Sequence, residues 1–542
     1  MLRIMGRNER CYCNSGLRFK NCHGELKKLE AMSNEINVVL KDIARAEKVS
    51  EQRTAQQGFG RPIISVKTKD ERRIVIVNNR IYSANGWNTF HEFLLDHLWE
   101  LMGQDWVEEQ LRRPVDERHP ILIWRQKYDI CKDSIDAKDG EVVNVPLTGA
   151  IAALIHIAYD MYALDHNADL QKKLVNRLRN QDQFIGAHYE VQVTAMLARA
   201  GFGIEFEDED DRTSRHCEFT ATHLQSGKKF SVEAKKNTGG RDNSTRHVSR
   251  ALGKDANHTR IIFVDLNSPE PPGDGPVPEY AKHAIRQLRN FERTQPHAQE
   301  LDHAYIFLTN SSFEHHLDDA DCRHFAIKEG FRIDDFKMDY EFPSLCSELD
   351  AWERHKEMHD LRRSISMHAD VPVTFDAHYP LLAFGNAASR PAIGKNYTVK
   401  NKNGIDTEAR LISAEVLEGK KIVVCTLIDV NNKKIVIERS FSEVELAIWK
   451  EDPSSYFKEH VEIKTVGTRA EMYEHYMEKS RSMSKLELLA AMRKEREFEK
   501  LHELEHSEIL KLFCVRMTEI AAEEMGPPPK ISFYSFPQRR PS

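Results

Sequence analysis

The pattern of apolar and polar positions predicts a multidomain α+β chain, and it is most regular between residues 184 and 310. From 184 to 200, apolar side chains recur at helical spacing, and Gly201 ends the pattern. Within 216–236, apolar and polar residues alternate on both sides of Ser226-Gly227, which predicts a hairpin of two strands. We therefore expect helices and short strands to alternate in this part of the chain.

The elements of this stretch follow in the order helix, three strands, helix, strand, helix, strand. They are a helix at 184–200, a strand at 202–206, the hairpin at 216–236, a helix at about 245–256, the strand RIIFVDLN, a helix at about 278–294 and the strand HAYIFLTN. The last two strands are continuously apolar, as strands at the centre of a sheet are. This order predicts an α/β core with a mixed sheet.

Outside this core, the pattern predicts helices towards both ends and a small β-rich unit. Thr89 with Glu92, and Ser484 with Glu487, form capping boxes, and the second begins one long charged helix over 484–513. The predicted units are a Cys-rich N-terminal motif (1–24), a helical linker (25–58), an α-rich domain (60–180), the α/β domain (181–345), a small antiparallel β-domain (390–450) and a C-terminal helical region (465–526).

Composition limits the class of protein. Of the 542 residues, 40% are hydrophobic and 30% are charged, which suits several cores with much solvated helix. The chain shows no apolar run that spans a membrane and no signal-peptide core, so we expect a soluble cytoplasmic protein. Nine scattered cysteines argue against a disulfide framework. The net charge of -7 means that nucleic-acid binding would need a local basic patch; nothing indicates an oligomeric state.

The N-terminal segment carries the spacing of a zinc site. Cys11, Cys13, Cys22 and His23 place three thiolates and an imidazole within thirteen residues. That donor set suits a closed tetrahedral Zn²⁺ site, and so short a segment needs a metal to fold. The segment closely resembles the SEC-C motif over residues 6–24, known from the tail of the bacterial export ATPase SecA. The resemblance implies structural zinc and an accessory contact module.

The predicted hairpin brings acids and a lysine to one polar face. By the period of two, Glu233 and Lys235 share a side of the second strand, and Glu218 lies on the polar side of the first. Carboxylate oxygens are ligands that Mg²⁺ and Mn²⁺ prefer, and a lysine neutralises charge on a phosphate or orients the attacking water. Taken alone, these charged residues are typical of an exposed hairpin with ordinary surface charges. Together with the order of the surrounding elements, they favour a metal-dependent phosphodiesterase site.

The stretch from about 184 to 310 resembles the core of the PD-(D/E)xK (restriction-endonuclease-like) nuclease superfamily. Glu233-Ala234-Lys235 stands at the (D/E)xK position, and Glu190 matches a further acid on the preceding helix. The first acid is Glu218 after Cys217, where the superfamily usually has Asp after Pro. The resemblance implies that Glu218, Glu233, Lys235 and Glu190 are catalytic and that Glu218 and Glu233 bind magnesium or manganese. Asp211 in the acidic loop 207–211 stays an alternative to Glu218.

A basic stripe follows the predicted hairpin. Arg246, Arg250 and Lys254 are spaced four residues apart on the helix expected at 245–256. The position of this stripe beside the proposed site suits contact with nucleic-acid phosphates. The alternative interpretation is that the stripe is an ordinary solvated helix face.

Two functions from different classes remain open. The first is a Mg²⁺-dependent nuclease of DNA, with RNA as an alternative substrate, that uses SEC-C as a targeting module; in bacteria such an assembly suggests genome defence or DNA repair. The second is a catalytically degenerate nuclease-fold protein that binds a protein, ribosome or export partner through SEC-C. A hydrolase using the SEC-C zinc is disfavoured, because four protein ligands leave no open position.

Overall fold

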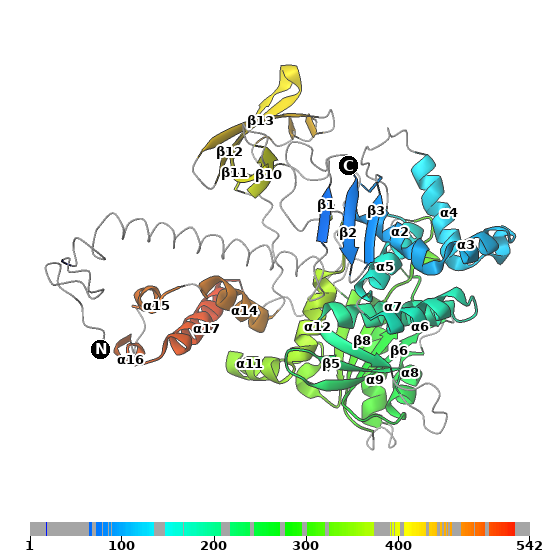
Figure 1. Cartoon of the computed structure of the whole chain (residues 1–542). Helices are drawn as coiled ribbons and strands as arrows, with labels where there is room; N and C mark the ends of the chain where they lie inside the picture. The colour runs from blue at the N-terminus through cyan, green and yellow to red at the C-terminus, as the bar shows by residue number, and fades with distance from the viewer. Residues whose placement is uncertain are drawn as a thin grey trace.

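The computed structural model describes most of the chain between residues 64 and 525. The described residues are 18, 64–67, 72–77, 80–84, 86–87, 89–134, 147–165, 167–206, 217–238, 243–270, 277–294, 301–319, 325–372, 375, 391, 393–394, 396–400, 406–429, 433–441, 445–446, 449–450, 453, 456–457, 468–481, 483–493 and 498–525. They form a mixed α+β structure, as the apolar pattern predicts (Figure 1).

A six-stranded mixed sheet is the centre of the structure. Its strands lie side by side in chain order: β4 (Phe202–Phe206), β5 (Phe219–His223), β6 (Lys229–Lys236), β7 (Arg260–Asp265), β8 (Ala304–Asn310) and β9 (Phe325–Phe331). The pairs β6–β7 and β7–β8 are parallel, and the other neighbours are antiparallel. The first five strands confirm the predicted elements, whereas β9 falls in a region where only helices and loops were expected.

Helices cover both faces of this sheet. Helices α7 (Phe184–Arg199) and α12 (Lys356–Met367) pack on one face, against side chains that include Val232, Ala234 and Phe263. Helices α8 (Ser244–Leu252) and α9 (Glu279–Thr294) pack on the other face. The predicted helices at 184–200 and 278–294 are confirmed, but the one expected at 245–256 ends at Leu252.

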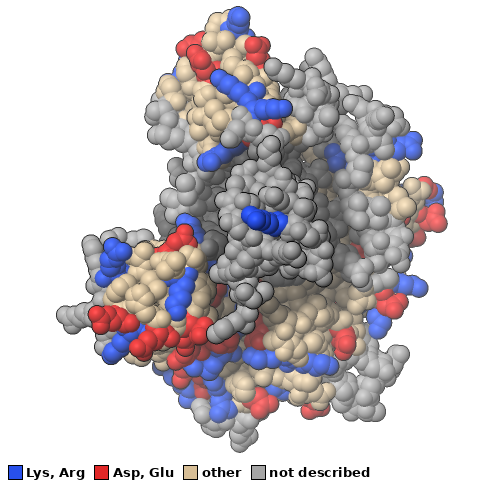
Figure 2. Space-filling view, turned by 60° about the vertical axis from the view of Figure 1, so that its left-hand side comes forward, with Lys and Arg blue, Asp and Glu red and all other residues tan. Residues whose placement is uncertain are grey.

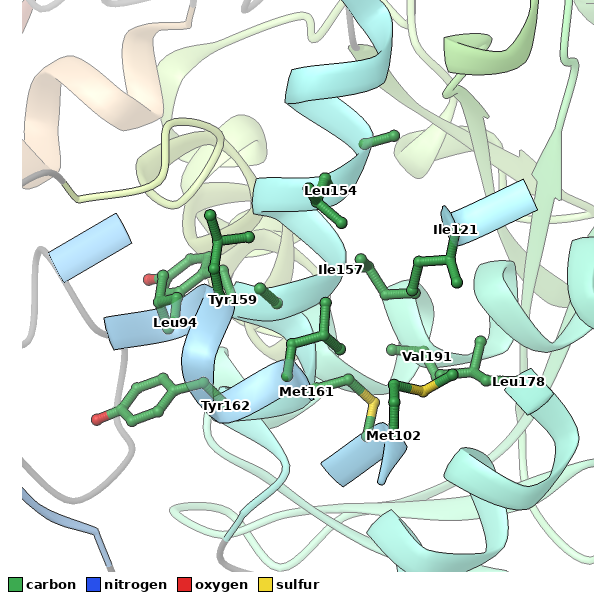
Figure 3. Close-up of a cluster of buried hydrophobic side chains, with 14 of the residues drawn as sticks. Leu94, Met102, Ile121, Leu154, Ile157, Tyr159, Met161, Tyr162, Leu178 and Val191 are labelled. Atoms are coloured by element: carbon green, nitrogen blue, oxygen red, sulfur yellow. The ribbon is translucent and has the colours of Figure 1, made fainter. Parts of the chain in front are cut away.

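A helical body shares α7 with the sheet. Tyr189 and Val193 of α7 face the sheet, while Val191 and Ala195 enter a second apolar core. That core is built mainly by α2, α4, α5 and α6, and Figure 3 shows part of it. The helices are α2 (Phe90–Met102), α3 (Gln104–Leu111), α4 (Pro120–Asp133), α5 (Gly149–Ala163) and α6 (Ala168–Arg179). Thr89 and Glu92 form the predicted capping box, and α5 is buried on nearly all sides.

Two smaller antiparallel sheets lie outside the central one. The first contains β1 (Ile64–Lys67), β2 (Arg73–Val77) and β3 (Arg80–Ala84). The second contains β10 (Asn396–Lys400), β11 (Asp406–Leu417), β12 (Ile422–Asp429) and β13 (Lys434–Ser440). The second sheet is the small antiparallel unit that the sequence predicts, and its core includes Cys425.

The C-terminal region differs from its prediction. The capping box of Ser484 and Glu487 is present, but the expected single helix over 484–513 is wrong. The helices here are α14 (Arg469–Ser480), α15 (Lys485–Ala491), α16 (Phe498–Leu501) and α17 (His506–Met525), and α11 (Leu345–Arg354) packs against α14. Leu489, Met492 and Leu501 are buried within this group. No helix in the described part of the chain has the length and apolar character needed to cross a membrane.

Candidate functional site

Two carboxylates face each other across neighbouring strands. The antiparallel register pairs Phe219 of β5 with Val232 of β6, so the next step places Glu218 opposite Glu233. The backbone N–H of Ala234 donates a hydrogen bond to Oε2 of Glu218 at 2.7 Å, which fixes that carboxylate beside β6. Because Val232 and Ala234 face α7, the alternation of side chains turns Glu233 to the opposite face of the sheet.

Lys235 joins the two acids. Its Nζ lies 2.5 Å from Oε1 of Glu218 and 2.7 Å from Oε1 of Glu233. The Glu233 side chain is 1% exposed, whereas Lys235 is 29% exposed, so the lysine connects a buried carboxylate to the surface. The structure thus brings together the three residues that the hairpin pattern singled out.

Lys254 belongs to this cluster. Its Nζ lies 2.5 Å from Oε1 of Glu233. The sequence predicts Lys254 on a helical stripe with Arg246 and Arg250, but α8 ends two residues before it and Gly253 caps the helix. Lys254 therefore turns into the site, while Arg246 and Arg250 stay exposed on α8.

On the face drawn in Figure 2, basic and acidic side chains of the described residues are interspersed, so that face presents no single large basic surface.

Burial sets the protonation of the first acid. Burial raises the pKa of Glu218 to about 7; the charge of Glu233 adds to this rise, and Lys235 opposes it. Burial alone would lower the pKa of Lys235, but Glu218 and Glu233 raise it above its ordinary value. The lysine therefore stays charged, and Glu218 titrates near neutral pH.

Glu190 lies on α7, on the other side of the sheet from Glu233. It forms an ion pair with Arg177 of α6, in which Nη1 lies 2.5 Å from Oε2 and Nη2 donates to Oε1 at 2.7 Å. Its charge contributes to the raised pKa of Glu218. The pairing of Glu190 with Arg177 thus joins two helices, and the catalytic role predicted for Glu190 stays a prediction.

Glu218 and Glu233 supply carboxylate oxygens, the ligand type that a hard divalent cation prefers. Oε2 of Glu233 is buried and has no hydrogen-bond partner among the described residues. Mg²⁺ commonly uses one or two carboxylates and keeps several waters, so Glu218 and Glu233 are the residues that could hold it here. Within the part of the chain that the structure describes, no group of three or more His, Cys, Asp or Glu side chains is arranged to hold a metal.

A second charged cluster, missed by sequence reasoning, lies on the opposite face of β6. Nζ of Lys236 lies 3.3 Å from Oδ2 of Asp265 and 3.3 Å from Oε1 of Glu314, and it donates to the backbone oxygen of Ser311 at 3.1 Å. Lys236 and Asp265 are buried. Asp265 also accepts from the backbone N–H of Ser311, so the cluster ties the ends of β6, β7 and β8 together. The only sequence signal was a second lysine after Lys235.

The predicted zinc ligands and the acidic loop lie outside the described residues. This applies to Cys11, Cys13, Cys22 and His23, to the linker 25–58 and to Asp211 within 207–211.

Comparison with protein families identifies a SEC-C motif at residues 7–25, which confirms that part of the sequence prediction. The comparisons with curated proteins and with solved structures return no match.

Proposed function

We propose that this protein is a divalent-metal-dependent nuclease whose site is formed by Glu218, Glu233 and Lys235, with DNA as the expected substrate and RNA as the alternative. The observation that carries the proposal is the contact of one lysine with two opposed carboxylates at the end of β6. An exposed hairpin with ordinary surface charges would not bury Glu233 to 1%.

The order of elements around the site supports the same proposal. Helix α7, the antiparallel strands β4, β5 and β6, helix α8 and the parallel strand β7 follow one another as the resemblance to PD-(D/E)xK nucleases implies. The first acid precedes β5, and the acid and lysine of the (D/E)xK pattern lie near the end of β6. A cytoplasmic location and a part in genome defence or DNA repair belong to this proposal.

Each residue has a distinct task in hydrolysis. Glu218 and Glu233 would hold Mg²⁺ or Mn²⁺, and the bound cation would act as a Lewis acid that lowers the pKa of a bound water. Lys235 remains protonated beside them and stabilises the negative charge that develops on the attacked phosphate. Lys254 holds the orientation of Glu233 through its ion pair and adds positive charge towards the substrate. Arg246 and Arg250 are placed on the exposed side of α8 for phosphate contact.

The SEC-C motif suggests a separate zinc module. Cys11, Cys13, Cys22 and His23 supply the four ligands of a closed site, which would stabilise the motif without taking part in hydrolysis. In this proposal, the motif contacts a protein or nucleic-acid partner and brings the nuclease to it.

A second candidate is a binding protein without nuclease activity. Glu218 takes the place of the usual Asp, and both lysine ammonium groups already contact the carboxylates. In that case Lys235 and Lys254 substitute for the cation, and binding depends on SEC-C and the exposed arginines.

A substrate screen separates the two candidates. Supercoiled plasmid, linear duplex, single-stranded DNA and RNA are each incubated with the full chain in Mg²⁺, Mn²⁺ or chelator. The nuclease predicts metal-dependent cleavage of at least one substrate that Lys235→Ala loses and Lys229→Ala keeps, because Lys229 is an exposed lysine of the same strand. Absence of cleavage across all substrates and metals leaves the binding protein as the function.

A further inference from the structure

A cavity lined by both polar and apolar side chains lies apart from the Glu218–Glu233 pair, where α5, α7 and α12 meet the ends of β8 and β9. It has a volume of about 60 Å³. A single water needs about 10–15 Å³ of such space, so the cavity has room for a small ion of several atoms. Each of the three helices contributes side chains to its lining. These are His156 and Asp160 of α5, Gln192, Met196 and Arg199 of α7, and Arg362, Ser366 and Ala369 on or just after α12.

Arg199 is the unusual member of this lining. Its side chain is 7% exposed, and Nη2 donates to Oδ1 of Asp160 at 2.6 Å. Its guanidinium group also stacks over the ring of Tyr159, with 4.5 Å between Cζ and the ring centroid. Nε and Nη1 have no hydrogen-bond partner among the described residues. Together these two nitrogens carry three N–H donors that no described residue accepts.

Unused buried donors indicate a ligand that accepts hydrogen bonds. A buried N–H without a partner is costly, and the cost is larger for a charged group. The other polar groups around the cavity include the hydroxyls of Ser311 and Ser366 and the amide of Gln192, which donates to Ser311 Oγ at 2.9 Å. Hydroxyl and amide groups from different elements, in one cavity with a guanidinium group, suit an oxyanion that accepts several hydrogen bonds.

The charged side chains that line the cavity are compatible with binding of an anion. The negative charge of Asp160 is balanced by Arg199 itself, and the Arg362 guanidinium forms an ion pair with Glu471 of α14. His156 and His368 also line the cavity and gain a positive charge when protonated. A dianion that binds here therefore meets paired charges and additional donors rather than an unpaired carboxylate.

We propose that this cavity is a binding site for a phosphate group, anchored by Arg199 and completed by the polar side chains of α7, α12 and the segment after β8. The phosphate comes either from free inorganic phosphate or from the terminal phosphate of an oligonucleotide. The site does not depend on the nuclease proposal, because its residues lie apart from Glu218, Glu233 and Lys235.

Binding is measured by titration calorimetry and thermal unfolding on the full chain in chelator, with sodium phosphate against sodium chloride of equal ionic strength. We expect one phosphate per chain and a raised midpoint of unfolding. Arg199→Lys keeps the charge beside Asp160 but loses the N–H donors of the guanidinium, so it weakens binding by about tenfold or more. Arg363→Gln, an exposed arginine of α12 outside the lining, keeps wild-type affinity.

Ala369→Leu decides the matter if Arg199→Lys fails to fold. It fills the cavity without removing a polar group, and we expect it to abolish phosphate binding while the unfolding transition stays cooperative. A 5′-phosphorylated oligonucleotide that competes where its 5′-hydroxyl counterpart does not identifies nucleic-acid ends as the source, and binding of inorganic phosphate alone identifies the free ion. No binding of either by the wild type, or equal binding by Ala369→Leu, overturns the proposal. Glu233→Gln binds phosphate like the wild type, so failure of the nuclease proposal is seen separately.

Discussion

The ammonium nitrogen of Lys235 lies 2.5 Å from Oε1 of Glu218, although the two residues are seventeen positions apart in the chain. The β5–β6 hairpin creates this contact, because its register brings the start of β5 to the end of β6. The same lysine also contacts Glu233, which forms a second ion pair with Lys254.

The raised pKa of Glu218 predicts a pH-dependent gain in stability for Glu218→Gln. The folded state holds its proton to about pH 7, while the unfolded chain loses it near its ordinary pKa of 4.5, so stability falls as pH rises through this window. The variant escapes that loss and gains up to about 3 kcal/mol relative to wild type between about pH 5 and pH 8. Urea unfolding in chelator at both pH values measures the free energy of unfolding of the variant and of wild type. The same difference in that free energy at both pH values would contradict the raised pKa of Glu218.

Glu357 supplies a control of opposite sign for that measurement. Burial alone would raise its pKa, but backbone hydrogen bonding and Lys228, 3.0 Å away, lower it below the ordinary value. Its ion pair therefore contributes stability above the ordinary pKa and loses it as pH falls through the lowered value. Glu357→Gln is thus expected to lose stability relative to wild type at the higher pH.

The start of α5 packs closely against the segment that follows β8, and substitutions at two glycines test this contact. A Cβ at Gly149 would lie 2.3 Å from the backbone oxygen of His316, whereas a Cβ at Gly186 in α7 meets no atom within 4 Å. Gly149→Ala is expected to destabilise the protein by about 2 kcal/mol or more, since backbone must move. Gly186→Ala is expected to stabilise it by up to about 1 kcal/mol through helix propensity. Chemical unfolding of both variants checks the opposite signs.

Arg246 and Arg250 are expected to contact nucleic-acid phosphates. With both changed to Ala, the slope of log affinity against log salt for duplex DNA should fall by about two, one per lost contact. The matched control changes Lys282 and Arg286, which are basic residues on α9. Binding is measured in chelator by fluorescence anisotropy at several salt concentrations. An unchanged slope would assign the two arginines to an ordinary solvated helix face.

The SEC-C module predicts about one zinc per chain. Cys11→Ser should lose that zinc, because a closed site needs all four ligands. Cys131→Ser, at a partly buried free cysteine of α4, should keep it. Metal analysis of the purified proteins settles the count, and zinc retained in Cys11→Ser would exclude that residue as a ligand.

Much of the central fold follows from local pattern, and the exceptions have physical causes. The helix at 184–199 and strands β4–β8 were predictable from helical spacing, alternation and continuous apolar runs. Strand β9 was missed because Lys328, Glu329 and Gly330 interrupt the apolar pattern of FAIKEGF. The helix predicted over 484–513 ends at Ala491 despite good helix formers, since Leu489 and Leu501 pack into a compact group of short helices instead.

The site was predictable in its residue types and not in its contacts. The period of two placed Glu233 and Lys235 on one face, but the pairing of Lys235 with Glu218 depends on the register between two strands. The approach of Lys254 depends on α8 ending at Leu252, before Gly253. Helical spacing alone assigned that lysine to a stripe with the arginines.

The most direct test of the central claim is the single-turnover cleavage rate of a nucleic-acid substrate by Glu233→Gln beside the wild type and Glu205→Gln, in Mg²⁺ and in Mn²⁺. Glu205 is an exposed acid on β4 and serves as the matched control. The proposed site predicts metal-dependent cleavage by wild type and Glu205→Gln, and a loss of about a hundredfold or more in Glu233→Gln. Equal cleavage by all three proteins, or none by any of them, would contradict it.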